Sequence, residues 1–315
     1  MSDPEKIIYE LNDHIEKVFN HTISIIKKLE YARYKPLTYL KVIDKNVASM
    51  MVSQRNMGGF MKSILVKRLE SSFEAFKKTL HRFIISYEKF ITMCESGKVF
   101  ISKKIDVYDL MDNGDDETLM ELVEEDKVQF YKIEDFNDEF MPALKRDLTR
   151  LRLLEEEWEE IIEDPKKDKF LYELKNNPVL KNKKIIIFTE SKETAEYVGL
   201  YLEELFPSQV IVFSGQSSEK VRKEIEANFD PKFDGQHKDD IQFLVTTDVL
   251  AEGINLHRSN VIVNYDLPWN PTKVMQRVGR INRVGTKHDK IYVFNFFPTA
   301  QANAELPLEE NIISK

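Results

Sequence analysis

The sequence is poor in cysteine, glycine and proline, and these shortages exclude several classes of protein. Its 315 residues include one cysteine, Cys94, so a single chain can form neither a disulfide framework nor a cysteine-based zinc site. We predict a reducing, cytoplasmic setting on this ground. Only 10 glycines and 11 prolines are present, which argues against an all-β protein full of tight turns and favours a helix-rich one.

Long apolar runs and an excess of positive charge are also missing. No segment approaches the roughly 18 consecutive apolar residues of a membrane-spanning helix, so we expect no membrane partner. The net charge of −8 excludes a protein that coats nucleic acid with its whole surface, although a local basic site remains compatible with it. The six histidines lack the spacing of metal ligands, and we predict no metal site.

The first 180 residues show the periodicity of helices. Apolar residues recur three or four positions apart over residues 64–91, which predicts one long amphipathic helix that begins after Gly58 and Gly59. A second long helix is predicted over about 138–162, and the acidic stretch 109–126 is expected to form a loop and a short helix. We therefore predict a helical insertion or brace domain over residues 1–180, without a catalytic constellation.

Strands and helices alternate after residue 180. Short apolar runs followed by amphipathic stretches predict a parallel α/β sheet with helices on its faces. The predicted strands cover residues 184–188, 210–213, 241–245, 261–265 and 291–296, and the predicted helices cover 193–206, 217–229 and 271–283. We assign this domain to residues 181–300 and a C-terminal tail to 301–315. Ligands of such sheets bind beyond the carboxyl ends of the strands, so the residues that follow each strand are the first candidates for a site.

Small polar residues occupy these positions. The first three strands are followed by Thr189, by Ser214 and Gly215, and by Thr247 and Asp248. Hydroxyl and amide groups at such points are suited to phosphate oxygens. Serine, threonine and aspartate also cap helices, so the pattern alone leaves both interpretations open.

Three arginines lie at the end of the last predicted helix. Arg277, Arg280 and Arg283 recur every three residues and therefore share one helix face. A solvated basic face is one interpretation, but apolar Val278 and Ile281 between them are typical of a helix that is fixed against the sheet. Cations held so close together repel one another without an anion. We therefore predict that this helix end binds a polyphosphate.

Several of these segments resemble the sequence motifs of superfamily two helicases. Residues 185–191 are similar to motif IV, residues 246–256 to motif V and residues 276–283 to motif VI. The run 265–271 between the last two resembles Swi/Snf- and RapA-type translocases more than the DEAD-box type. Residues 65–72 also resemble the helical region that such proteins insert before this lobe. The chain is thus similar to the C-terminal RecA-like lobe of a Swi/Snf- or RapA-like bacterial or archaeal helicase, preceded by a helical domain.

Three residues depart from the patterns of related helicase branches and so narrow the resemblance. Glu252 stands where DEAD-box proteins have arginine, and Gln276 stands where they and many RNA helicases have histidine. Gly279 stands where many Swi/Snf proteins have an acid, which disfavours a eukaryotic-type remodeller.

The resemblance implies a role in ATP hydrolysis for motifs V and VI. Arg280 and Arg283 would be catalytic arginine fingers, which neutralise charge on the γ-phosphate. Gly253, Asn255 and Gln276 would bind ATP, with the glycine allowing close approach of the backbone.

A second set of residues is implied to bind nucleic acid. Thr189, Ser214, Gly215 and Thr247 would contact the phosphate backbone, which carries no base identity. Asp248 is interpreted as a structural link between the two surfaces, with a helix cap as the alternative.

The chain lacks the other half of an ATPase site. No Gly-x-x-x-x-Gly-Lys-Ser/Thr phosphate loop occurs in it, and no acidic pair follows a predicted buried strand. The resemblance implies that ATP and Mg²⁺ are bound mainly by an N-terminal RecA-like lobe, and that the second partner is nucleic acid, by preference double-stranded DNA. We interpret the chain as the C-terminal part of an ATP-dependent helicase or translocase and expect it to be inactive alone. The alternative is a non-catalytic interaction module with a degenerate motor fold.

Overall fold

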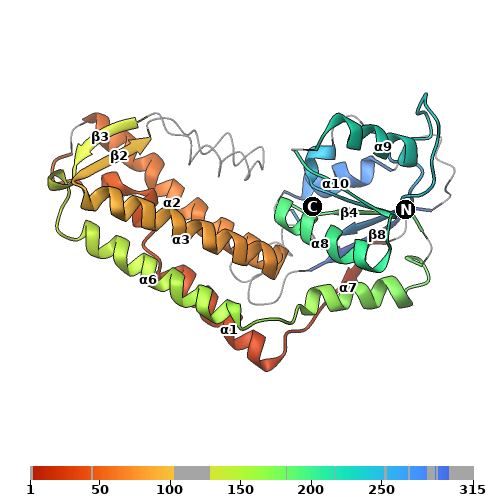
Figure 1. Ribbon diagram of the computed structural model, residues 1–315, viewed down its shortest axis with the longest axis horizontal. Helices are drawn as coiled ribbons and strands as arrows, with labels where there is room; N and C mark the ends of the chain where they lie inside the picture. Colours follow the sequence, from red (N-terminus) through yellow and green to blue (C-terminus); the bar gives the residue numbers. More distant parts are fainter. Residues whose placement is uncertain are drawn as a thin grey trace. The chain divides into compact units, whose positions relative to one another are not determined.

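A parallel sheet and a group of long helices form two separate units of the chain (Figure 1). The computed structural model describes residues 3–43, 45–102, 128–181, 183–215, 217–251, 254–268, 270–281, 288 and 290–297. The α/β unit comprises Met1–Asn12, Glu70–Ala75 and Glu163–Lys315, and the helical unit comprises Asp13–Leu69 and Phe76–Ile162. Within the described ranges no helix is both long enough and apolar enough to cross a membrane.

The α/β unit is built on a six-stranded sheet in which every neighbouring pair of strands is parallel. Its strand order is β1-β8-β7-β4-β6-β5. The strands are β1 (Glu5–Ile7), β4 (Ile185–Phe188), β5 (Val210–Phe213), β6 (Phe243–Thr246), β7 (Val261–Asn264) and β8 (Tyr292–Phe296). The three central strands are buried along their whole length, which is why they appear in the sequence as continuous apolar runs. The predicted parallel α/β fold is confirmed.

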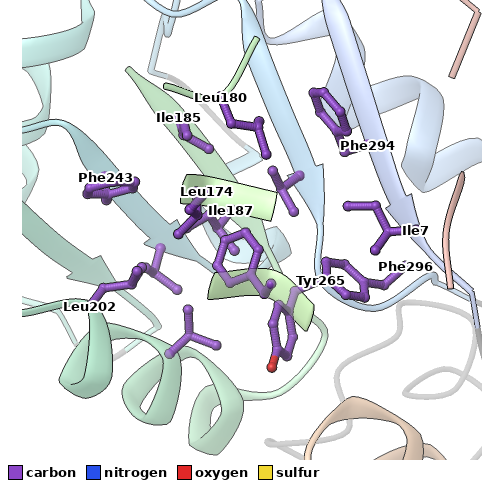
Figure 2. Close-up of a cluster of buried hydrophobic side chains, with 14 of the residues drawn as sticks. Ile7, Leu174, Leu180, Ile185, Ile187, Leu202, Phe243, Tyr265, Phe294 and Phe296 are labelled. Carbon is purple, nitrogen blue, oxygen red and sulfur yellow. The ribbon is translucent and has the colours of Figure 1, made fainter. Parts of the chain in front are cut away.

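Helices cover both faces of the sheet because side chains alternate along each strand. Figure 2 shows one of the two clusters, in which Ile185 and Ile187 of β4 lie with Leu174 and Leu202. Leu174 belongs to α7 (Pro165–Asn176) and Leu202 to α8 (Lys192–Leu205). On the other face, Ile186 and Phe188 cluster with residues of α9 (Glu219–Phe229) and α10 (Pro271–Gly279).

The α/β unit includes segments that precede residue 181, which is the start that the sequence predicts for this domain. Strand β1 pairs with β8 at one edge of the sheet, and Ile7 joins the same apolar cluster as Leu174 of α7 (Figure 2). Phe170 of α7 belongs to this cluster as well. Residues near the N-terminus and just before 180 therefore contribute to the core of this unit. The sequence did not predict the role of β1 in this core, because a strand of three residues is too short to show a periodic pattern.

The helical unit contains four long helices and a two-stranded antiparallel ribbon among its described residues (Figure 1). The helices are α1 (Asp13–Lys28), α2 (Lys45–Ser71), α3 (Phe73–Glu95) and α6 (Phe140–Glu159). The end of α2 and the start of α3 lie in the segment Glu70–Ala75, which belongs to the α/β unit. Three short 3₁₀ turns are η1 (Ala32–Tyr34), η2 (Pro36–Tyr39) and η3 (Ile133–Asp135). The ribbon pairs β2 (Lys98–Ser102) with β3 (Val128–Lys132). Helix α6 confirms the second predicted helix, and the acidic stretch 109–126 lies outside the described residues.

The single helix predicted over residues 64–91 is wrong, because the structure has two helices with a break at Ser72. Helix α2 runs through Gly58 and Gly59, and α3 begins at Phe73. Glycine inside a helix costs only about 1 kcal/mol relative to alanine, which a long helix tolerates. Ser72 instead acts as a cap, since its Oγ accepts a hydrogen bond from the backbone N–H of Ala75 at 3.1 Å.

Candidate functional site

The carboxyl edge of the sheet brings several of the predicted site residues into one row. The last paired residues of β4, β5, β6 and β7 are in register with one another. The ladder extends one step further through hydrogen bonds from Thr189 N to Thr246 O at 3.0 Å and from Thr247 N to Phe213 O at 3.4 Å. Thr189, Ser214 and Thr247 thus follow three adjacent strands at the same level, as the alternation of strands and helices predicted.

Within this row, Thr247 has the hydroxyl group best suited to a ligand. The side chain is only 5% exposed, and no described residue lies within hydrogen-bond distance of its Oγ1. A buried hydroxyl without a partner is costly, so such an atom is a strong candidate for a contact with a bound molecule. Ser214 is 8% exposed and is followed by Gly215, which is open to solvent.

Thr189 is placed differently from its neighbours in the row. The residue is fully buried, and its Oγ1 donates a hydrogen bond to Asp266 Oδ2 at 2.6 Å. The same carboxylate accepts a hydrogen bond from Glu190 N at 2.7 Å and another from Ser71 Oγ. The structure therefore gives the Thr189 side chain an internal partner, and its hydroxyl is not presented to a ligand.

Ser71 and Ser72 join this network from a distant part of the sequence. Ser71 Oγ lies 2.7 Å from Thr194 Oγ1, and Ser72 Oγ lies 2.8 Å from the same atom. The hydroxyl cluster fixes the turn between α2 and α3 beside the ends of β4 and β7. The sequence does not predict these contacts, because Ser71 and Ser72 lie more than 120 residues from Thr194 in the chain.

A buried lysine holds the same turn from another side. Lys166 of α7 donates hydrogen bonds from Nζ to Glu70 O at 2.6 Å and to Ser71 O at 2.9 Å. Its ammonium group also lies 4.6 Å from the centre of the Tyr265 ring. Burial lowers the pKa of Lys166, although the charges of Asp266, Glu70 and Asp164 partly oppose this shift. The sequence does not predict these contacts of Lys166, because α7 contains several lysines and nothing in the pattern distinguishes this one.

Of the three predicted arginines, Arg277 is not available to an anion. The residue is fully buried, and its guanidinium donates to Asp248 from Nε at 2.6 Å and from Nη2 at 3.1 Å. Its Nη1 donates to Asn264 Oδ1 at 3.0 Å and to Asp266 O at 3.2 Å. The idea that all three arginines share an anion-binding face is therefore wrong, and the interpretation of Asp248 as a structural link agrees with this geometry.

The ion pair shifts the pKa of the aspartate. Burial alone would raise the pKa of the Asp248 carboxyl, but the charges and hydrogen bonds of Arg277 and Lys273 outweigh burial and hold that pKa below its usual range. Lys273 Nζ lies 3.6 Å from Asp248 Oδ2. The pair anchors α10 to the end of β6, which sets the position of the residues that follow the helix.

Arg280 lies in a different environment although it is only three residues further on. It is half-buried at the end of α10, and no carboxylate among the described residues pairs with its guanidinium. Its carbonyl accepts a hydrogen bond from Leu256 N at 3.4 Å, which brings it beside Asn255. Gln276 is exposed one helical turn earlier, on the same side of α10 as Arg280. The structure thus brings Arg280, Gln276 and Asn255 into one region, while Gly253 and Arg283 lie outside the described residues.

The comparison with protein families agrees with the fold. Residues 166–285 match the family described as the helicase conserved C-terminal domain. The α/β unit is a helicase C-terminal domain with a RecA-like fold. The start of the match at residue 166 agrees with the inclusion of α7 in this unit.

Similar proteins include helicases of several kinds. YqhH of Bacillus subtilis, described as an uncharacterized ATP-dependent helicase, is 36% identical over 112 residues, which are 36% of this chain and 18% of YqhH. The RNA polymerase-associated protein RapA of Photobacterium profundum is 32% identical over 140 residues, 44% of this chain and 14% of RapA. The DEAD-box ATP-dependent RNA helicase 15 of Arabidopsis thaliana is 36% identical over 104 residues, 33% of this chain and 22% of the helicase.

A solved structure is similar over more of the chain. The helicase domain of Pyrococcus furiosus Hef aligns with 97% of this chain and 57% of its own length, at 17% identity and a TM-score of 0.46. The chain spans about a fifth of the curated relatives it matches.

Proposed function

We propose that this chain supplies the second motor lobe of an ATP-dependent DNA helicase or translocase. The observation that carries the proposal is the row at the carboxyl edge of the sheet, where Thr247 presents a buried hydroxyl without a partner among the described residues. Helix α10, which ends next to Arg280, follows β7 in the chain. One surface for a polyphosphate and one for a nucleic-acid backbone are what a lobe needs to couple ATP hydrolysis to movement.

On the nucleotide side, the residues are compatible with ATP. Arg280 carries a positive charge that no described carboxylate neutralises, on a helix whose position is fixed by the Arg277–Asp248 pair. We propose that Arg280 and Arg283 are arginine fingers, and that Gly253, Asn255 and Gln276 line the nucleotide. When bound, ATP supplies the phosphoryl group whose negative charge these guanidinium groups would stabilise.

The remaining parts of the ATPase site would come from a partner lobe. The described residues contain no group of three or more His, Cys, Asp or Glu side chains that could hold a metal ion. Because the sequence contains no Gly-x-x-x-x-Gly-Lys-Ser/Thr phosphate loop, we propose that Mg²⁺ and the other phosphate contacts belong to an N-terminal RecA-like lobe of the same motor.

On the nucleic-acid side, we propose that Ser214, Gly215 and Thr247 contact the phosphate backbone of double-stranded DNA. Thr189 would act indirectly by fixing Asp266 and the end of β4. Relatives described as an RNA helicase and as an RNA polymerase-associated protein are also similar to this chain, so RNA is the competing ligand. A cytoplasmic location is proposed from the single, buried Cys94.

The test is duplex binding by this chain with Thr247→Val, which keeps the shape of the side chain and removes the hydroxyl. A hydrogen bond to a charged phosphate contributes roughly 1.5–3 kcal/mol, so we expect affinity for a fluorescent DNA duplex to fall about tenfold or more. Stability should be unchanged or slightly higher, because the hydroxyl has no partner in the free protein.

Thr149→Val on the exposed side of α6 is the matched control and should leave affinity unchanged. Equal duplex affinity of Thr247→Val and the wild type would contradict the proposed contact. A parallel titration with duplex RNA decides which nucleic acid the row prefers.

A further inference from the structure

The ribbon of the helical unit has two faces of opposite character. Val99 and Ile101 of β2 are 0% and 4% exposed, so they face the core of the unit. The alternate residues of both strands lie on the other face. We call this the ribbon face, and we define it by Lys98, Phe100, Phe130 and Lys132, which are exposed.

Two phenylalanine rings stand together at the centre of the ribbon face. Phe100 and Phe130 are directly opposite in the register, and their ring centroids are 5.4 Å apart with a tilt of 52°. They remain 40% and 52% exposed. The rings therefore pack against each other but leave flat apolar surface open to solvent, which commonly marks a binding site.

Two lysines lie beside the rings on the same face. Lys98 and Lys132 are also directly opposite each other, and both are exposed. Like charges at directly opposed positions destabilise an antiparallel pair. No acidic side chain in the described part of the chain forms an ion pair with either lysine, so an external anion would relieve this repulsion.

We propose that the ribbon face binds a single strand of nucleic acid, with unpaired bases stacked on Phe100 and Phe130 and phosphates beside Lys98 and Lys132. A nucleic-acid strand offers flat uncharged faces and regularly spaced negative charges, and the ribbon face offers the complement of both. An apolar protein partner would leave the lysines unpaired, and an acidic peptide would leave the rings uncovered.

This site is separate from the proposed motor function. Only the choice of nucleic acid as its ligand rests on that proposed function. It belongs to the helical unit, whereas the proposed duplex contacts belong to the α/β unit. It would let the protein hold an unpaired strand as well as a duplex.

The test measures binding of this chain to a fluorescent single-stranded oligonucleotide and to a blunt duplex. Phe100→Leu/Phe130→Leu keeps the apolar character of the ribbon and removes the rings. Stacking on an aromatic side chain is worth roughly fivefold to a hundredfold in affinity per base, so we expect the double variant to lose at least about tenfold for the single strand. Affinity for the blunt duplex should not change.

A charge variant tests the lysines separately. Lys98→Gln/Lys132→Gln should weaken single-strand binding and reduce the slope of log affinity against log salt by about 1.4, the value for two phosphate contacts. The control Lys17→Gln/Lys175→Gln removes two exposed lysines elsewhere and should leave the slope nearly unchanged.

The outcomes separate this proposal from the motor function. If the leucine variant binds the single strand as well as the wild type, or if the wild type does not bind it, the ribbon site is overturned while duplex binding through Thr247 can persist. If the rings instead mediate self-association, sedimentation will show dimers of the wild type that the leucine variant lacks, and that result also overturns the proposal.

Discussion

At the scale of single residues, Arg277 and Arg280 lie only three positions apart but occupy two different environments. Arg277 is fully buried and satisfied by Asp248, Asn264 and a backbone carbonyl. Arg280 is half-buried without a carboxylate partner among the described residues. The sequence predicted a basic helix end, but spacing alone could not show which arginine is paired, because Asp248 lies 29 residues away in the chain.

Because of the Arg277–Asp248 pair, the free energy of unfolding should decrease as the pH falls into the acid range. The pKa of Asp248 is lower in the folded protein than in the unfolded chain, where an aspartate has a pKa of about 3.9. The carboxylate therefore contributes stability above about pH 4, and this contribution is lost as the pH falls through the lower, folded-state pKa.

We expect Asp248→Asn to lower the free energy of unfolding at pH 7 by about 3–5 kcal/mol, because it leaves the buried guanidinium of Arg277 without its countercharge. The difference from the wild type should shrink when unfolding in urea is repeated below pH 4. A constant difference across this pH range would show that the pair does not titrate as the structure implies.

At the scale of elements, the sequence predicted the buried strands well and the irregular joins poorly. The three central strands are continuous apolar runs, so each was located to within about two residues. The pairing of β2 with β3 and that of β1 with β8 were missed, since both join segments far apart in the chain and β1 has only three residues. The break at Ser72 was missed because the side chain of Ser72 is also held by Thr194, which lies 122 residues away in the chain.

Helix packing gives a prediction that contrasts two glycines. In α8, a Cβ on Gly199 would lie 2.2 Å from Val212 Cγ2 of β5, whereas a Cβ on Gly59 in α2 would meet nothing within 4 Å. Gly199→Ala should therefore lower the free energy of unfolding by about 1–3 kcal/mol through overpacking. Gly59→Ala should raise it by up to about 1 kcal/mol, because alanine is the better helix former.

Urea unfolding of both variants checks this contrast, and each variant serves as the control of the other. Equal effects of the two substitutions would mean that α8 does not approach β5 as closely as the structure shows.

At the scale of the whole molecule, two units share one chain and the α/β unit carries the recognised domain. The sequence correctly indicated an α/β part and a helical part, but the division in space does not follow a single point in the chain. Glu70–Ala75 lies in the middle of the helical sequence and yet belongs to the α/β unit. Hydrogen bonds from Lys166 and to Asp266 hold this segment, and contacts of this kind cannot be inferred from composition or periodicity.

We propose that this chain acts as a motor lobe and that Arg280 is one of its arginine fingers. The most direct test is DNA-stimulated ATP hydrolysis by the full-length protein that carries this chain, compared with Arg280→Ala and with Arg152→Ala, which removes an exposed arginine of α6. We predict that DNA stimulates ATP hydrolysis by the wild type and by the Arg152→Ala variant. Arg280→Ala should remain folded and lose about a thousandfold in turnover. The 315-residue chain alone should show no turnover. Unchanged hydrolysis by a folded Arg280→Ala protein, or no hydrolysis by the full-length wild type, would contradict the account and favour a non-catalytic binding module.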